Sequence, residues 1–138
     1  MMMRLLAFGI LIFSSLILSA CASGTGLSDE LERSVKSFNR LLRWHEIESA
    51  GRTYIAPELQ EEYMIQAESL KKRGLAVTDF RILSSRYLPE KKTGSVVAEF
   101  DYYLLTSGRV KTVSYPQEWV YLENIKSWRL TSRLPLFE

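Results

Sequence analysis

Apolar and polar residues follow three different patterns along this chain of 138 residues. Between Leu5 and Leu18 nearly every residue is apolar. Between Asp29 and Gly74 apolar residues recur every three or four positions, which is the spacing of an amphipathic helix. Beyond Gly74 branched and aromatic residues dominate and alternate with polar ones at several points, which is typical of strands. The pattern therefore predicts an apolar leader, a helical half and a strand half.

Two helices are expected in the helical half. The first begins at Asp29, which forms a capping box with Glu32, and Gly51 offers its stop. The second begins at Pro57 and ends before Gly74, with acidic residues in its first turn and basic residues in its last. The apolar positions at helical spacing are Leu31, Val35, Phe38 and Leu42 in the first helix and Leu59, Tyr63, Ala67 and Leu70 in the second. The basic run Lys71, Lys72, Arg73 is interpreted as a helix terminus rather than as a binding patch.

The strand half predicts an antiparallel meander. Residues 75–88 alternate poorly, so their faces cannot be assigned, and residues 89–94 form a polar loop. Residues 95–105 alternate cleanly, and Ser107-Gly108 and Glu123-Asn124 are interpreted as two-residue turns. Val96, Ala98, Phe100, Tyr102 and Leu104 then share the apolar face, and Glu99, Asp101 and Tyr103 share the other.

These turns fix a cross-strand register for both hairpins. The predicted pairs are Tyr102 with Val113, Phe100 with Tyr115, Asp101 with Ser114, Trp119 with Trp128 and Glu118 with Arg129. Both hairpins place their apolar side chains on the same side of the sheet, which a wrong register would rarely do.

Two helices followed by such a meander predict an α+β domain, with the helices packed on one face of a curved antiparallel sheet of about four strands. From about Asp29 to Phe137 the chain resembles the nuclear transport factor 2-like superfamily, the cone-shaped fold shared with ketosteroid isomerases and polyketide cyclases. The resemblance rests on the order of elements and on the ending EWVYLENIKSWRLTSRLP, which is similar to the last hairpin of such domains. A cystatin-like sheet around a single helix is the nearest alternative, and two helices count against it.

The apolar leader is too short to span a bilayer, because about fourteen residues stand where a spanning helix needs roughly twenty. Arg4 is the only charge before Asp29, and small residues follow the apolar run. A positive start, a short apolar centre and small residues are the three parts of a secretory signal peptide. Its ending Leu18-Ser19-Ala20-Cys21 closely resembles the lipobox of bacterial lipoproteins.

That resemblance implies that residues 1–20 are removed, that the sulfur of Cys21 carries a diacylglycerol and that the new amino end is acylated. Two or more acyl chains anchor a protein stably, whereas one chain holds it reversibly. Residues 21–27 are then a lipidated cysteine and a flexible tether, and residues 28–138 are a single α+β domain. Ala22, rather than an aspartate, follows the cysteine, which in Gram-negative lipoproteins implies the periplasmic side of the outer membrane.

Composition and charge exclude several classes of function. The chain has 18 basic and 16 acidic residues, and loss of the leader removes one basic residue, so the mature charge is close to zero. A nucleic-acid binder would show a clustered basic face, so no nucleic acid is expected as a partner. Cys21 is the only cysteine and is used as the anchor, and His45 is the only histidine and has no partners at metal-ligand spacing. No metal, cofactor or disulfide is expected.

The apolar side of the predicted sheet holds the candidate binding residues. Trp44, Tyr102, Tyr115, Trp119 and Trp128 are the candidate lining of a pocket, together with Phe38 and Tyr63 from the helices. The alternative is that these aromatic side chains simply fill the core. Because ketosteroid isomerases pair a base with an oxyanion donor in a dry cavity, Asp101 and Tyr102 are the candidates for such chemistry, although alternation puts them on opposite sides.

Two functions remain open from the sequence. The first is a membrane-anchored, non-catalytic binding or assembly module for an envelope protein or a small apolar ligand. The second is a small isomerase- or cyclase-like enzyme on the same scaffold. The direction of Asp101 discriminates between them, since a base must face the cavity.

Overall fold

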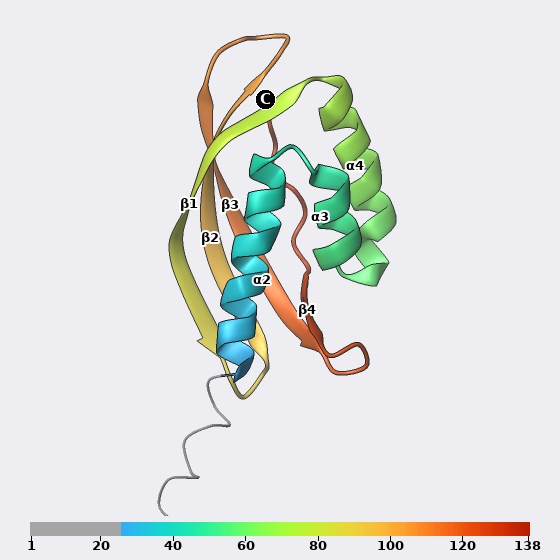
Figure 1. The fold of residues 1–138 in the computed structure, drawn as a ribbon, viewed down its shortest axis with the longest axis vertical. Coiled ribbons are helices and arrows are strands. Elements are labelled where there is room, and N and C mark those ends of the chain that lie inside the picture. Colours follow the sequence, from blue (N-terminus) through green and yellow to red (C-terminus); the bar gives the residue numbers. More distant parts are fainter. Residues whose placement is uncertain (1–25) are drawn as a thin grey trace, which may run out of the picture.

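The computed structural model describes residues 26–138, and the predicted signal peptide and Cys21 lie outside these residues. The elements are α2 (Gly26–Arg43), α3 (Ile47–Tyr54), the short 3₁₀-helix η2 (Pro57–Leu59), α4 (Gln60–Lys72), β1 (Leu75–Leu88), β2 (Thr93–Leu104), β3 (Lys111–Leu122) and β4 (Ser127–Leu130). Figure 1 shows the helices on one face of the sheet, which curves around α2. The predicted α+β architecture, with helices on one face of a curved antiparallel sheet of four strands, is confirmed.

The sheet is an antiparallel meander in the order β1-β2-β3-β4. Along β2 buried side chains alternate with half-buried ones at every position, so its predicted apolar face is confirmed. The outer strand β1 is interrupted by two bulges, between Val77 and Asp79 and between Ile82 and Ser84. These bulges explain why the residues of β1 alternate poorly, since each extra residue reverses the faces that follow it.

Both predicted hairpin registers are wrong by two residues. The connection between β2 and β3 runs from Leu105 to Val110 and that between β3 and β4 from Glu123 to Lys126, so both are longer than a two-residue turn. The observed pairs are Phe100 with Val113, Ala98 with Tyr115, Asp101 with Thr112, Tyr102 with Lys111, Ser95 with Glu118, Trp119 with Leu130, Tyr121 with Trp128 and Val120 with Arg129. An even shift keeps each side chain on its predicted face, so the division between core and solvent is unaffected.

The predicted first helix, from Asp29 to Gly51, is in fact two helices. His45 adopts the left-handed conformation with φ 63°. Its N–H donates to the carbonyl of Leu42 at 3.1 Å, and the N–H that follows donates to the carbonyl of Leu41 at 2.8 Å. This pair of hydrogen bonds is a Schellman motif, which ends α2 before the chain turns into α3.

Gly51 does not stop a helix, because it lies within α3. A Cβ at this position would collide with the ring of Tyr63, so the glycine allows α3 and α4 to approach closely. The second helix agrees better with its prediction. Pro57 begins the 3₁₀ turn that leads into α4, and Gly74, with φ 71°, ends the helix by donating its N–H to the carbonyl of Lys71 at 3.1 Å.

The core lies between the sheet and the helices. The predicted apolar stripe of α2 is buried, and Phe38 at its centre contacts the rings of Tyr54, Tyr115 and Trp119 with centroids 5.8–6.3 Å apart. None of the helices found between residues 26 and 138 combines the length and the apolarity that crossing a bilayer requires.

Candidate functional site

The structure brings four of the five candidate pocket residues together and separates the fifth from them. Tyr102, Tyr115, Trp119 and Trp128 point inward from the sheet and are at most 3 % exposed. Trp44 instead lies on the surface, 64 % exposed, with the guanidinium of Arg43 at 5.3 Å from its ring centroid. The five aromatic residues therefore do not share one cavity.

The polar ends of the buried aromatic residues mostly bond to protein groups. The hydroxyl of Tyr102 donates to the carbonyl of Glu138 at 3.1 Å, and the indole N–H of Trp128 donates to the carbonyl of Leu27 at 3.1 Å. The hydroxyl of Tyr115 has no partner among the described residues, and burial raises the pKa of Tyr115 well above its usual value. These contacts are those of packed core residues.

An amide pair that the sequence does not reveal crosses this core. Asn39 of α2 and Gln117 of β3 are both fully buried. The amide nitrogen of Gln117 donates to the amide oxygen of Asn39 at 2.7 Å, and the Asn39 amide donates to the carbonyl of Val35 at 2.8 Å. The indole N–H of Trp119 donates to the amide oxygen of Gln117 at 3.2 Å. Both buried amides thus form hydrogen bonds with other protein groups. Because these bonds join α2 to β3, the network fixes the position of α2 on the sheet.

Asp101 lies on the outer face of the sheet, opposite to Tyr102. Its carboxylate accepts a hydrogen bond from Arg81 at 2.8 Å and another from the hydroxyl of Thr112 at 2.7 Å. These two partners lower the pKa of Asp101 to about 2. The nearby Glu99 also pairs with Arg81, at 2.6 Å. Asp101 faces away from the helices, and its lowered pKa makes it a weak proton acceptor, so it is not placed to act as the base of a cavity between the sheet and the helices.

A groove lies between α4 and the segment that follows β4. Its volume is about 490 Å³, which falls within the range of ligand sites. Figure 1 shows this last segment running back alongside α4 towards the end of that helix. The lining residues are Ile65, Gln66, Ser69, Leu70 and Arg73 from α4 and Leu134, Pro135, Leu136, Phe137 and Glu138 from the last segment.

The last segment is held in place by its own sequence. Leu134 and Phe137 are buried, and the ring of Phe137 meets that of Tyr102 edge-on at 4.9 Å. At the start of the segment the N–H of Thr131 donates to the carbonyl of Glu118 at 2.8 Å. One wall of the groove is therefore an extended chain anchored in the core at two positions.

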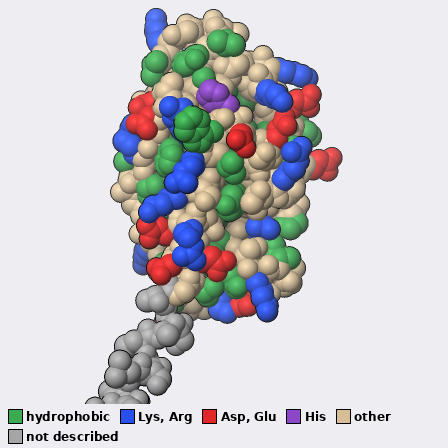
Figure 2. Space-filling view, in the orientation of Figure 1, with side chains coloured by type: hydrophobic (Ala, Val, Ile, Leu, Met, Phe, Trp, Pro, Cys, Tyr) green, Lys and Arg blue, Asp and Glu red, His purple; other side chains and the backbone are tan. Residues whose placement is uncertain are grey.

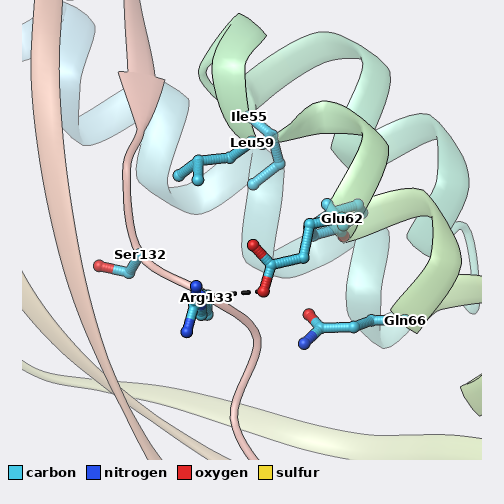
Figure 3. A pocket seen from close by; sticks show the side chains of 7 residues that line it. Ile55, Leu59, Glu62, Gln66, Ser132 and Arg133 are labelled. Carbon is cyan, nitrogen blue, oxygen red and sulfur yellow. Dashed lines mark ion pairs between the residues drawn. The ribbon is translucent and has the colours of Figure 1, made fainter.

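Two contacts join this wall to α4, one near each end. Figure 3 shows Arg133 pointing towards Glu62, and their ion pair measures 2.9 Å. At the other end the guanidinium of Arg73 donates to the carbonyl of Phe137 at 3.0 Å. These contacts set the width of the groove between them.

The groove has an apolar floor, an exposed apolar rim and an end that carries charged residues of both signs. Ile65 and Leu136, on opposite walls, are 65 % and 78 % exposed. Arg73 and Glu138 line the end where α4 finishes. Within residues 26–138 no aspartate or glutamate side chain lies within 4.0 Å of the Arg73 guanidinium, whereas the ammonium of Lys111 donates to the main-chain oxygen of Glu138 at 2.8 Å. The arrangement suits an apolar group, and Arg73 is available to an acid on that group.

His45 lies elsewhere, at a cavity of about 150 Å³ that Glu46, Glu48 and Lys71 also line. Between residues 26 and 138, no three histidine, cysteine, aspartate or glutamate side chains come together as a metal site would require.

No family model matches the chain, and no curated protein matches its sequence. Several solved structures resemble it, among them the following two. The intermembrane space region of the chloroplast protein ARC6 is 10 % identical with a TM-score of 0.44, over 82 % of this chain and 95 % of that one. A candidate nuclear transport factor 2-like transpeptidase from Campylobacter jejuni is 14 % identical with a TM-score of 0.49, over 75 % of this chain and 99 % of that one. Function does not follow from either likeness.

Proposed function

We propose that this protein is a lipid-anchored lipoprotein of the cell envelope that binds an apolar segment of another envelope protein without catalysis. The observation that carries the proposal is the groove between α4 and the last segment, with the aliphatic side chains of Ile65 and Leu136 exposed on its two walls. Paired exposed aliphatic residues on either side of a groove are typical of binding surfaces.

A protein segment fits the groove better than a small molecule does. Pockets for small molecules bury 70–90 % of the ligand surface. Here the rim residues are more than half exposed, so a small apolar molecule would leave both itself and the rim in contact with water. A helix or an extended peptide would cover the rim, and an acidic residue on it would pair with Arg73. That cation supplies the charge complementarity.

The anchor is proposed from the leader alone, since Cys21 lies outside the described residues. The lipobox-like Leu18-Ser19-Ala20-Cys21 supports lipidation of Cys21, and Ala22 supports the periplasmic side of the outer membrane. The start of α2 lies at the end of the domain where the β1–β2 and β3–β4 turns lie (Figure 1). The anchored end of the domain is thus the end with these two turns.

The groove is tested with a photo-crosslinking amino acid in place of Ile65, in the protein expressed in its own envelope. We expect one discrete protein adduct. Leu136→Lys should reduce its yield about tenfold or more, because binding would bury an ammonium group against apolar side chains. The measurement is the adduct yield on an immunoblot, followed by mass spectrometry of the adduct.

The matched control is Leu83→Lys, which makes the same change at a leucine of β1 that is 55 % exposed. It should leave the yield unchanged. A yield that survives Leu136→Lys contradicts the proposed site. If mass spectrometry instead finds this protein with an added mass equal to that of a small molecule, and no protein adduct, the groove binds a small apolar ligand rather than a protein segment.

Cys21→Ser should abolish the anchor. Without a sulfur to alkylate, the protein should either leave the membrane fraction or remain as the unprocessed precursor. Fractionation of cell envelopes with mass determination of the released chain checks this. A processed Cys21→Ser protein that still sediments with membranes would show that the lipobox interpretation is wrong.

A further inference from the structure

The exposed face of α2 carries four cations in a line. Arg33, Lys36, Arg40 and Arg43 lie within a sector of about 80° around the helix at 100° per residue. The N–H of Trp44 donates to the carbonyl of Arg40 at 3.0 Å, so Trp44 continues the helical path and lies at the edge of the same sector. We call these four cations and Trp44 the basic stripe. It extends about 16 Å along the helix.

Most of this charge is not neutralised. Within the described residues, Arg33 and Arg40 have no carboxylate within 4.0 Å, whereas Lys36 pairs with Glu32 at 2.6 Å. Arg43 donates to the carbonyl of Val77 at 3.3 Å. Figure 2 shows Lys and Arg side chains running down the part of this face where Figure 1 places α2.

The acids of α2 do not cancel the stripe along its length. Asp29, Glu30 and Glu32 all lie in its first two turns, and no acidic residue follows them before the helix ends. Beyond Glu32 the exposed face therefore presents only cations and neutral residues, and it ends at an exposed indole ring.

We infer that the basic stripe lies on anionic phospholipid headgroups of the membrane that holds the protein, an inference that rests on the proposed anchor at Cys21. Five residues of chain lead from Cys21 to Gly26 and reach at most about 18 Å when fully extended, so α2 starts within reach of the surface. Basic residues close to a membrane are attracted by anionic lipids, and tryptophan favours the headgroup level, where its ring is apolar and its N–H meets water.

Lipid is favoured over an acidic protein because the stripe belongs to the helix that directly follows the tether. Contact along α2 would lay the domain on its side, with a membrane contact spread over the helix rather than confined to the anchored end. The acyl chains would supply attachment, and the stripe would supply orientation.

The protein offers a built-in probe for this contact. Of its three tryptophans, Trp119 and Trp128 are buried and Trp44 is exposed. Quenching of tryptophan fluorescence by neutral acrylamide therefore reports the exposure of Trp44. The experiment reconstitutes the purified lipidated protein into vesicles of phosphatidylcholine alone and into vesicles that also contain about 30 % phosphatidylglycerol.

We expect the quenching constant to be about two-fold lower in the anionic vesicles and to return to the neutral-vesicle value at high salt. Arg33→Glu/Arg40→Glu should abolish the difference between the two vesicles. Arg52→Glu/Arg109→Glu makes the same change in net charge at two exposed arginines outside the stripe and should preserve it. Trp44→Phe should remove the change in quenching between the two kinds of vesicle, which would assign that change to Trp44.

Equal quenching of the parent in the two vesicles overturns the proposal, as does shielding that survives Arg33→Glu/Arg40→Glu. Shielding that appears only in membranes containing their native proteins also overturns it and assigns the stripe to an acidic protein surface. Flotation with phosphatidylcholine vesicles reports the anchor separately. A protein that does not float with phosphatidylcholine vesicles, but whose Trp44 is still shielded from acrylamide by anionic vesicles, would disprove the anchor. The proposed contact between the basic stripe and anionic lipid would then remain supported.

Discussion

Trp128→Ala should destabilise the domain by about 3–5 kcal/mol, close to the whole stability expected of a domain of this size. The ring is 1 % exposed and meets Tyr87 of β1 at 5.9 Å and Tyr121 of β3 at 5.6 Å, both edge-on. Its N–H also bonds to the carbonyl of Leu27 at the start of α2. Truncation would leave a cavity where three strands and a helix meet. Urea unfolding followed by circular dichroism measures the loss.

Trp44→Ala is the matched control, because it removes the same ring from a surface position. Its effect should stay within about 0.5 kcal/mol, as is usual for surface substitutions. A Trp128→Ala protein as stable as the control would show that Trp128 does not hold the core together.

Asn39→Leu should cost about 1–3 kcal/mol, although it adds apolar surface to an apolar core. The substitution removes the acceptor of the Gln117 amide N–H and leaves that buried donor without its partner. An unsatisfied buried amide loses its hydration without gaining a hydrogen bond. The change in free energy of unfolding again comes from urea titration.

The double variant Asn39→Leu/Gln117→Leu separates the pair from its surroundings. Replacing both amides removes the orphaned Gln117 amide, while the indole N–H of Trp119 loses its acceptor just as it does in Gln117→Leu alone. The double variant should therefore be more stable than the sum of the two single effects predicts, by about 1 kcal/mol or more. Strict additivity would show that the two amides do not depend on each other.

The sequence predicts which side of each helix and strand is buried better than it predicts how the strands pair. Periodicity alone identifies Val96, Phe100 and Tyr102 as inward residues, and all three are buried. The pairing failed because the shortest turns were assumed. Gly108, with φ 61°, lies within a longer connection whose N–H groups return to the carbonyl of Leu104 at 2.9–3.0 Å. The length of a loop leaves no periodic pattern in the sequence, so periodicity could not predict it.

The break between α2 and α3 was missed for a related reason. No glycine or proline marks it, and His45 takes the left-handed conformation that glycine usually supplies. Histidine is enriched there among the other residues but is not diagnostic. The stop comes from packing, since Ile47 and Ala50 of α3 are buried in the same core as α2.

The candidate groove depends on contacts between segments that are far apart in the chain. Ile65 is visible in the sequence only as an apolar residue outside the buried stripe of its helix, and Leu136 only as one of several apolar residues in the last segment. What makes them opposite walls is the docking of Phe137 against Tyr102, which no local pattern shows. The buried aromatic residues, by contrast, were evident from composition and alternation.

The two bulges of β1 bear on how the protein behaves when many copies crowd one membrane. The proposed anchor would confine the domains to a plane, where an outer strand with free N–H and C=O groups invites pairing with a neighbour and aggregation. At the other edge of the sheet, β4 is met by Ile55, which forms a bridge with Leu130. Along β1 the bulges break the regular spacing of those groups, and the exposed Arg86 adds charge. The strand is thereby a poor template, and the domain can be packed densely on a surface without its sheets joining.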